Sequence, residues 1–352
     1  MTHDPSAMMT GMASTPPLRA AGTPPTSGDV ARVAGVSRAT VSYVLNNTEG
    51  GRVSEATRER VRDAARQLGY VPHAVARALR AGRSGIVLLT APAVTVGPLF
   101  AHAYADLQQA LAELGHTAVL YGPTGARGAE AGRRWAELRP DAVLSLMDDS
   151  MDEDAVAVLH KAGVGVVLGW GPVPVPGAHA LVADQEQVGF RAVEHLAAVG
   201  RRTLGVIVPA DASLRGFAEP RLAGAEKGAR AQDAVTVVRQ DLALDEGAAA
   251  RWARQCAEAG IDGLFAYNDE YAALAVRALQ DAGKRVPEDV AVVGADDLLI
   301  GRLLRPRLTT VRMDYPPSRE IAQLLNRLIG APGTPPETHD ILRTSLVVRE
   351  SA

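Results

Sequence analysis

Short apolar runs alternate with helical stretches along the chain after Arg83. Such alternation is typical of parallel β-sheets with helices on both faces. At least six such units exceed one compact doubly wound sheet, so we expect two lobes with a cleft, where ligands bind at the carboxyl ends of strands. The expected strands are Ile86 to Leu89, Ala118 to Tyr121, Ala142 to Leu146, Val164 to Leu168, Leu204 to Val208, Gly263 to Tyr267 and Val290 to Val293.

The composition excludes several classes of protein. The chain has 352 residues, of which 47% are hydrophobic and 22% charged, as in soluble globular proteins. Its apolar runs are far shorter than the roughly 18 residues that span a bilayer, so we expect no membrane partner. The single cysteine, Cys256, excludes a disulfide framework and a cysteine-based zinc site. The eight histidines are scattered without metal spacing, so we expect no metal and no cofactor.

Residues 1–25 are rich in Pro, Thr, Ala and Met. They lack the basic start and the apolar stretch of about 7 to 15 residues that mark a secretory signal. We therefore expect a disordered leader in a cytoplasmic protein.

The charge is distributed unevenly along the chain. Residues 26–83 contain ten arginines against five acids, whereas residues 84–352 contain 26 basic and 34 acidic residues. A basic first module before an acidic body suggests a polyanion partner for the front of the chain only. The alternative is a solvated surface on which charges cluster by chance.

The basic module has the pattern of a helix-turn-helix. The hydroxyl of Thr26 can cap a first helix that ends at Gly35, and Ser37 can cap a second helix of amphipathic pattern. A third helix from the cap Ser54 to Gly69 can close a small core over these two. An ordinary helical bundle is the alternative, but it does not explain the arginine excess.

These segments resemble the DNA-binding headpiece of the lactose and galactose repressor (LacI/GalR) family. The headpiece resemblance lies in Asp29 to Asn46, Val53 to Arg58, Leu68 to Pro72 and Ala74 to Arg80. The body resembles the periplasmic-binding-protein-like effector domain of the same family, in Gly200 to Gly205, Arg221 to Gly224, Asn268-Asp269, Val286 to Asp297, Leu308 to Val311 and Leu346 to Ser351. The resemblance implies a helix-turn-helix headpiece at 26–72, a hinge helix at 73–83 and a two-lobed α/β effector-binding and dimerisation domain at 84–352.

The resemblance also implies which residues contact DNA. A recognition helix enters the major groove with its N-terminal residues near the base edges, which places Arg38 and Ala39 first and Tyr43 one turn further on. Arg38 can bond guanine O6 and N7, or it contacts a phosphate without reading a base. Ala39 can only touch a thymine methyl. The other headpiece residues expected at the DNA, as phosphate contacts or caps, are Thr26, Ser37, Thr40, Ser42 and Asn46.

By resemblance, residues 73–81 form a short helix when two copies meet on an operator. Ala76 and Leu79 would then enter the minor groove, with Leu79 as the wedge that kinks the duplex. An ordinary amphipathic linker is the alternative.

The body carries the expected effector contacts. Arg221, Asn268 and Asp296 are expected to follow strand ends, and they match effector-contacting positions of the family. Each has an alternative: Asn268 and Asp296 can cap helices, and Arg221 can pair with a carboxylate across the cleft. Phe100 and Trp170 are also expected after strands, where they can stack on a ligand or belong to the core.

No catalytic signature is found. The segment Gly122-Pro123-Thr124-Gly125 is not a phosphate-binding loop, because no Gly-Lys-Ser/Thr follows it. We therefore expect a non-enzymatic, ligand-responsive transcription regulator of the repressor type, binding a palindromic double-stranded operator as a homodimer and switched by a small polar effector such as a sugar. The alternatives are a solute-binding protein of a transport system and an enzyme on the same scaffold.

Overall fold

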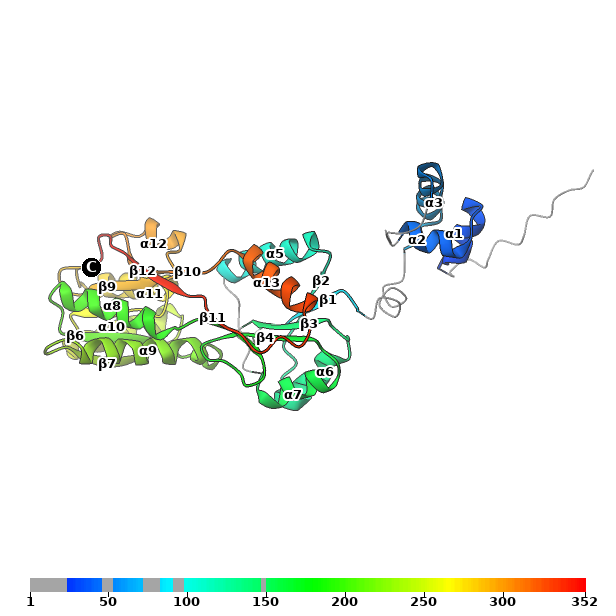
Figure 1. Ribbon diagram of the computed structural model, residues 1–352. Helices are drawn as coiled ribbons and strands as arrows, with labels where there is room; N and C mark the ends of the chain where they lie inside the picture. Colours follow the sequence, from blue (N-terminus) through cyan, green and yellow to red (C-terminus); the bar gives the residue numbers. More distant parts are fainter. Residues whose placement is uncertain (1–23, 46–52, 72–82, 91–97, 147–149) are drawn as a thin grey trace, which may run out of the picture. The chain divides into compact units, whose positions relative to one another are not determined.

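A computed structural model describes residues 24–45, 53–71, 83–90, 98–146 and 150–352 (Figure 1). Contacts divide the chain into a first unit that ends at Ser84 and a second unit, Gly85–Ala352. No helix in the described segments is both long and apolar enough to span a membrane.

In its described residues, the first unit contains three helices, α1 (Ser27–Ala34), α2 (Arg38–Leu45) and α3 (Glu55–Leu68). Their shared core is small and is centred on Val30, Val41 and Val61. The expected helix boundaries are confirmed. Thr26 and Asp29 form a reciprocal capping box at the start of α1, and α1 and α3 end at Gly35 and Gly69, whose φ angles are +66° and +63°.

The described residues of the second unit form two lobes, each built on one six-stranded sheet, so the expected doubly wound, two-lobed fold is confirmed. Lobe 1 has the strand order β11-β5-β4-β3-β1-β2, and lobe 2 has the order β12-β10-β9-β8-β6-β7. All neighbouring strands are parallel except the pair of β10 and β12. The strands of lobe 1 are β1 (Ile86–Thr90), β2 (Thr117–Tyr121), β3 (Ala142–Leu146), β4 (Val166–Gly171), β5 (His179–Val182) and β11 (Thr338–Asp340), and those of lobe 2 are β6 (Thr203–Pro209), β7 (Thr236–Leu242), β8 (Gly263–Phe265), β9 (Ala291–Ala295), β10 (Thr309–Asp314) and β12 (Arg343–Val347).

The helices follow the same division. Lobe 1 has α5 (Pro98–Glu113), α6 (Gly128–Ala136), α7 (Glu153–Lys161) and α13 (Ser318–Gly330). Lobe 2 has α8 (Glu186–Ala198), the short 3-10 helix η1 (Ala212–Leu214), α9 (Arg215–Arg230), α10 (Glu246–Glu258), α11 (Asp269–Asp281) and α12 (Leu299–Leu303).

Both faces of the lobe 1 sheet are covered, which explains its continuous apolar strands. In β1, Val87 and Leu89 face the core under α5 and α13, whereas Leu88 faces the core under α6 and α7. Figure 1 shows these two helix pairs on opposite sides of the sheet. The carboxyl ends of β1, β3 and β4 consequently lie together at one edge.

In lobe 2, α8 and α9 approach each other so closely that only glycine fits at the contact. A Cβ atom on Gly224 would lie 2.6 Å from the carbonyl carbon of Glu186, and one on Gly189 would lie 2.8 Å from the backbone nitrogen of Ala225. This contact places Arg221 of α9 beside the start of α8.

The described chain crosses between the lobes three times. It passes from β5 to α8, from β10 to α13 and from β11 to β12. The residues in these crossovers, 183–185, 315–317 and 341–342, therefore join the two lobes.

Some sequence-based strand boundaries are wrong. The strand expected at Val164 to Leu168 is β4, which begins at Val166 and continues to Gly171, and the one expected to reach Tyr267 ends at Phe265. Five strands were not expected: β5 and β11 are very short, β7 is a polar edge strand, and β10 and β12 form the antiparallel pair next to the crossovers. Short or polar edge strands lack the apolar run on which the expectation depended.

Candidate functional site

The candidate DNA-binding surface is one face of α2. Val41 and Val44 are buried in the headpiece core, whereas Arg38, Ala39 and Tyr43 are exposed. The Arg38 side chain passes over Gly28, where an added Cβ would lie 3.9 Å from its Nε. The exposed side of α2 therefore presents the three residues expected at base edges.

The polar headpiece residues act first as caps. Ser37 Oγ accepts a hydrogen bond from Thr40 N at 3.1 Å, and the two hydroxyls lie 2.9 Å apart. Thr26 Oγ1 accepts from Asp29 N at 3.4 Å. Ser42 is half-buried on α2. The remaining expected DNA contacts, Asn46, Ala76 and Leu79, lie outside the described residues, as does most of the expected hinge segment.

Arg221 is the centre of the polar network in lobe 2. The sequence predicted that Arg221 follows a strand end, but the residue lies within α9, and only 4% of it is exposed. Its Nε donates to Gln185 Oε1 at 3.0 Å, its Nη1 donates to the Tyr267 carbonyl oxygen, and its guanidinium lies 4.7 Å from the centre of the Tyr267 ring. Its Nη2 is 3.7 Å from Asp296 Oδ1. The expected alternative of a pair across the cleft is wrong, because Asp296 belongs to the same lobe.

Asp296 follows β9 directly and has a left-handed backbone with φ +96°. Its Oδ1 is buried and has no hydrogen-bond partner in the described part of the chain. Burial raises the pKa of this carboxyl, and Arg221 opposes that effect. A buried carboxylate oxygen without a donor is costly, so it is suited to accept a hydrogen bond from a ligand.

Asn268 is the N-cap of α11, as the alternative reading expected. Its Oδ1 accepts from Tyr271 N at 3.0 Å. The cap leaves the side-chain amide nitrogen as the group that can donate to a ligand.

Lobe 1 contributes an aromatic wall. Trp170 was expected after a strand, but it lies within β4, which extends to Gly171. Its ring packs against Tyr315 with centroids 5.5 Å apart, and its Nε1 is buried without a partner among the described residues. Phe100 likewise does not follow a strand directly but lies in α5, and its side chain is outside the description.

Sequence reasoning missed Thr90, the last residue of β1. Its Oγ1 is buried and, within the described segments, also has no hydrogen-bond partner. Thr90, Trp170 and Asp296 thus bring three unsatisfied polar atoms to carboxyl ends of parallel strands, where ligands bind in such sheets. The position of Thr90 at the end of an apolar run was the available signal.

Sequence reasoning also missed Asp269, which holds the loop that carries Asp296. Asp269 is fully buried, and it accepts hydrogen bonds from Thr310 Oγ1 at 2.7 Å and from Leu298 N at 2.6 Å. Burial raises its pKa to about 7, although both hydrogen bonds favour the ionised form. Asp269 thereby makes the bond to the start of α12, so the alternative that Asp296 caps this helix is wrong.

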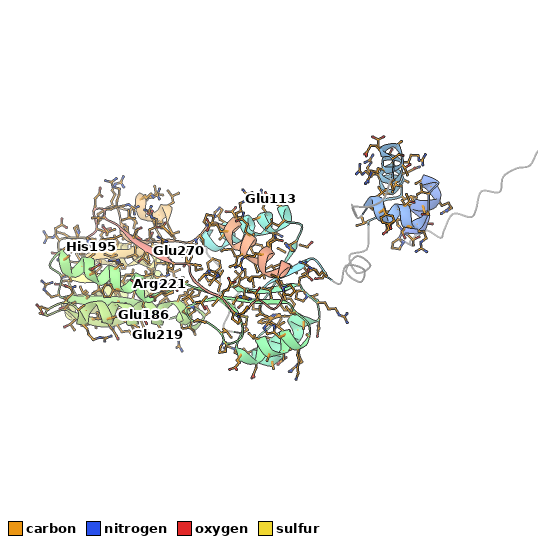
Figure 2. The ribbon with its side chains drawn as sticks, in the orientation of Figure 1. Glu113, Glu186, His195, Glu219, Arg221 and Glu270 are labelled. Atoms are coloured by element: carbon orange, nitrogen blue, oxygen red, sulfur yellow. The ribbon has the colours of Figure 1, made fainter. Side chains whose placement is uncertain are left out.

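Asp297 has a different role from its neighbour. Its buried carboxylate is bound by Arg349, and Arg302 and Arg312 lie 3.3 Å and 3.8 Å away. These three cations neutralise Asp297, so Asp296 is the carboxylate of the pair that lacks a full set of partners. In Figure 2, Arg221 and Glu270 lie in lobe 2, and Glu270 adds negative charge near Asp296.

The chemistry of the site fits binding. Among the described residues, no group of three His, Cys, Asp or Glu side chains is placed to hold a metal ion. Cys256 is buried, and burial raises its pKa to about 11, so its thiol stays protonated at neutral pH.

Two family models match the chain. The model for bacterial regulatory proteins of the lacI family matches residues 27–73, and that for the periplasmic binding protein-like domain matches residues 193–352. The HTH-type transcriptional regulator CelR of Thermobifida fusca is 34% identical over 342 residues, covering 93% of this chain and 98% of CelR. The HTH-type transcriptional repressor PurR of Photobacterium profundum is 30% identical over 305 residues, covering 84% and 88%.

Solved structures agree with these relatives. A complex of the transcriptional regulator CelR with cellobiose has a TM-score of 0.62 at 31% identity and covers 93% of this chain and all of that one. The lac repressor dimer bound to operator and the anti-inducer ONPF has a TM-score of 0.73 at 26% identity and covers 94% and 99%. With the three-helix arrangement of the first unit and the two-lobed body, these likenesses establish that the chain belongs to the lacI family of bacterial regulatory proteins.

Proposed function

We propose that this DNA-binding transcription regulator is a homodimeric repressor that binds a palindromic operator through α2. Its affinity for the operator is changed by a small polyhydroxylated effector that binds between its lobes. The repressor would act on the nucleoid in the cytoplasm. The observation that carries the DNA part is the exposed set of Arg38, Ala39 and Tyr43 on a helix whose other face is buried. A helix of this kind reads base edges in the major groove.

The test of this function is selection of genomic fragments by the purified protein at a fixed salt concentration, followed by sequencing. We expect enrichment of one inverted repeat and a steep loss of affinity as salt rises, because phosphate contacts release counterions. A solute-binding protein would ignore DNA at any salt, and that result would favour the transport alternative.

Replacing Arg38 with alanine should relax the preference of the protein at one position of each half-site. The loss of a bidentate contact to guanine is worth about 1 to 3 kcal/mol of discrimination, which is roughly 5- to 150-fold. Competition binding against operator variants measures this loss of discrimination, with Arg254→Ala, at an exposed position of α10, as a matched control. Equal weakening on every sequence would instead assign Arg38 to a phosphate.

The dimer proposal is supported by α12. Leu299 and Leu303 on this short helix are 68% and 69% exposed, and Ile300 is also exposed. Adjacent exposed leucines are suited to a protein interface, and a second copy is the partner that a two-fold symmetric operator requires.

We expect Leu303→Asp to convert the dimer to a monomer in sedimentation velocity, because a carboxylate would be buried in the interface without a partner. Leu244→Asp, at a leucine that is 55% exposed elsewhere in lobe 2, should leave the mass unchanged. If Leu303→Asp dimerises as tightly as the unmodified protein, α12 is not part of the dimer interface.

The effector proposal is supported by the three unsatisfied polar atoms. Trp170 Nε1 needs an acceptor, Asp296 Oδ1 needs a donor, and Thr90 Oγ1 can serve as either. Hydroxyl groups satisfy all three, and the rings of Trp170 and Tyr315 offer an apolar face. Because CelR has been solved with cellobiose, cellobiose is the first probe, followed by a panel of mono- and disaccharides.

Asp296→Asn should weaken binding of the sugar selected from that panel by roughly 10- to 100-fold, since a hydrogen bond to a charged group is worth about 1.5 to 3 kcal/mol. Calorimetric titration measures the affinity, and Asp154→Asn, at an exposed position of α7, is the control. Unchanged affinity in Asp296→Asn would place the sugar away from this carboxylate.

A further inference from the structure

A second cavity lies at the crossovers between the lobes, apart from the effector cleft. It has a volume of about 470 Å³ and is lined by α13, by β5 and β11 of lobe 1, and by β10 and β12 of lobe 2. It contains none of Arg221, Asp296 or Trp170. We call it the hinge cavity, because Tyr315 and Ile341 in its wall belong to two of the three crossovers.

The hinge cavity combines an apolar floor with a charged rim. Leu181, Ile321 and Ile341 are buried at its floor. At the rim, Glu320 and Asp340 are exposed, and neither forms an ion pair with any described residue. The volume falls within the range of small-molecule sites, which is about 300 to 1,000 Å³.

Two of the other charged side chains at the rim, Asp314 and His339, have partners of their own. Asp314 lies 3.6 Å from Arg312, whereas Arg343, which is opposite Asp314 in the antiparallel register of β10 and β12, is exposed and forms no ion pair with any described residue. His339 Nε2 is 3.1 Å from Glu337 Oε2. The two carboxylates without partners are therefore Glu320, on α13, and Asp340, on β11.

One side chain connects the hinge cavity with the effector cleft. The Tyr315 ring packs on Trp170, and its hydroxyl accepts a hydrogen bond from Gln185 Nε2 at 3.4 Å. Gln185 in turn accepts from Arg221, the partner of Asp296. A molecule in the hinge cavity would thus touch both lobes and the wall of the cleft.

We propose that the hinge cavity binds a short aliphatic diamine and that this binding is coupled to the lobe arrangement at the effector cleft. Two ammonium groups match the two unpartnered carboxylates, and the methylene chain that joins them matches the apolar floor of Leu181, Ile321 and Ile341. Because the lining comes from both lobes, affinity for the diamine depends on the angle between them. A ligand that prefers one angle between the lobes changes the affinity for the ligand of the effector cleft, and that ligand changes the affinity for the diamine by the same factor.

The test is calorimetric titration of the full chain with 1,4-diaminobutane at constant ionic strength. We expect saturable binding that is at least 10-fold weaker in the double variant Glu320→Gln, Asp340→Asn. The matched control is Asp233→Asn, Glu288→Gln, which removes two exposed acids of lobe 2 that do not line the cavity. The uncharged 1,4-butanediol should not bind. Equal binding to the two double variants, or no saturable binding to the unmodified protein, overturns the proposal.

The coupling has its own readout, which depends on neither the operator nor the identity of the effector. Binding of 1,4-diaminobutane should change the tryptophan fluorescence of the protein through Tyr315 and Trp170, and Trp170→Phe should abolish that change while calorimetric binding persists. An unaltered fluorescence change in Trp170→Phe overturns the assigned connection. A negative result for diamine binding in the hinge cavity is therefore distinguishable from a negative result for operator binding or sugar binding.

Discussion

Gly224→Ala should lower the free energy of unfolding of the second unit by about 3 kcal/mol or more, at the upper end of the range for overpacked sites. The added Cβ would lie 2.6 Å from the carbonyl carbon of Glu186, and closer still to its oxygen. Backbone atoms cannot rotate away as the end of a flexible side chain can, so α8 and α9 must separate. Denaturant unfolding, with the midpoint and slope compared, measures the loss.

The same helix offers a matched control. Gly216 also lies in α9, but an added Cβ there would meet no atom within 4 Å. Gly216→Ala should therefore be neutral or stabilise the fold by about 0.4 to 1 kcal/mol, since alanine restricts the unfolded chain. Equal effects of the two substitutions would contradict the close helix contact. Separation of α8 from α9 would also move Arg221 away from Gln185.

Asp269→Asn should remove a pH dependence from the stability of the second unit. The pKa of Asp269 is raised from its ordinary value of 3.8 to about 7 in the folded state, so between these values the folded protein holds a proton that the unfolded chain has lost. This contribution to the free energy of unfolding is fully present at the acid end of that range, decreases as pH rises towards 7, and changes little above it. Its full size is on the order of 4 kcal/mol.

The measurement is the difference in unfolding free energy between the unmodified protein and Asp269→Asn, taken from pH 5 to pH 8. The difference isolates Asp269 from acids whose pKa is lowered, such as Glu337 beside Arg327, which act in the opposite direction. Asp233→Asn, at an exposed site, should show no such trend. A difference that is flat with pH would mean that Asp269 ionises in the folded state at its ordinary pKa.

Local sequence signals were sufficient for the headpiece. Thr26, Ser37 and Ser54 cap the three helices, and Gly35 and Gly69 end two of them, because capping depends on residues within one turn of the helix end. The buried parallel strands were found for the same reason, since a strand covered on both faces is a continuous apolar run. The short strands β5 and β11 carry no such run, and only their pairing in the sheet makes them strands.

The candidate site could be predicted only in part. Asp296 directly follows a strand, as the sequence predicted, but Arg221 was also expected after a strand and lies within a helix. Thr90 and Asp269 were missed because nothing in their local pattern shows that Thr90 lacks a partner. Nor does it show that Asp269 accepts hydrogen bonds from the Leu298 backbone nitrogen and the Thr310 hydroxyl, about 30 and 40 residues away.

The sequence by itself determined that this chain has a helix-turn-helix before a two-lobed α/β body, because helix caps, apolar periodicity and the arginine excess are local properties of the chain. Only the tertiary structure decided which polar atoms of the cleft lack partners, how closely α8 meets α9, and that a second cavity adjoins the crossovers. Those features depend on contacts between residues far apart in sequence, and burial and hydrogen-bond satisfaction are defined only once such contacts have formed.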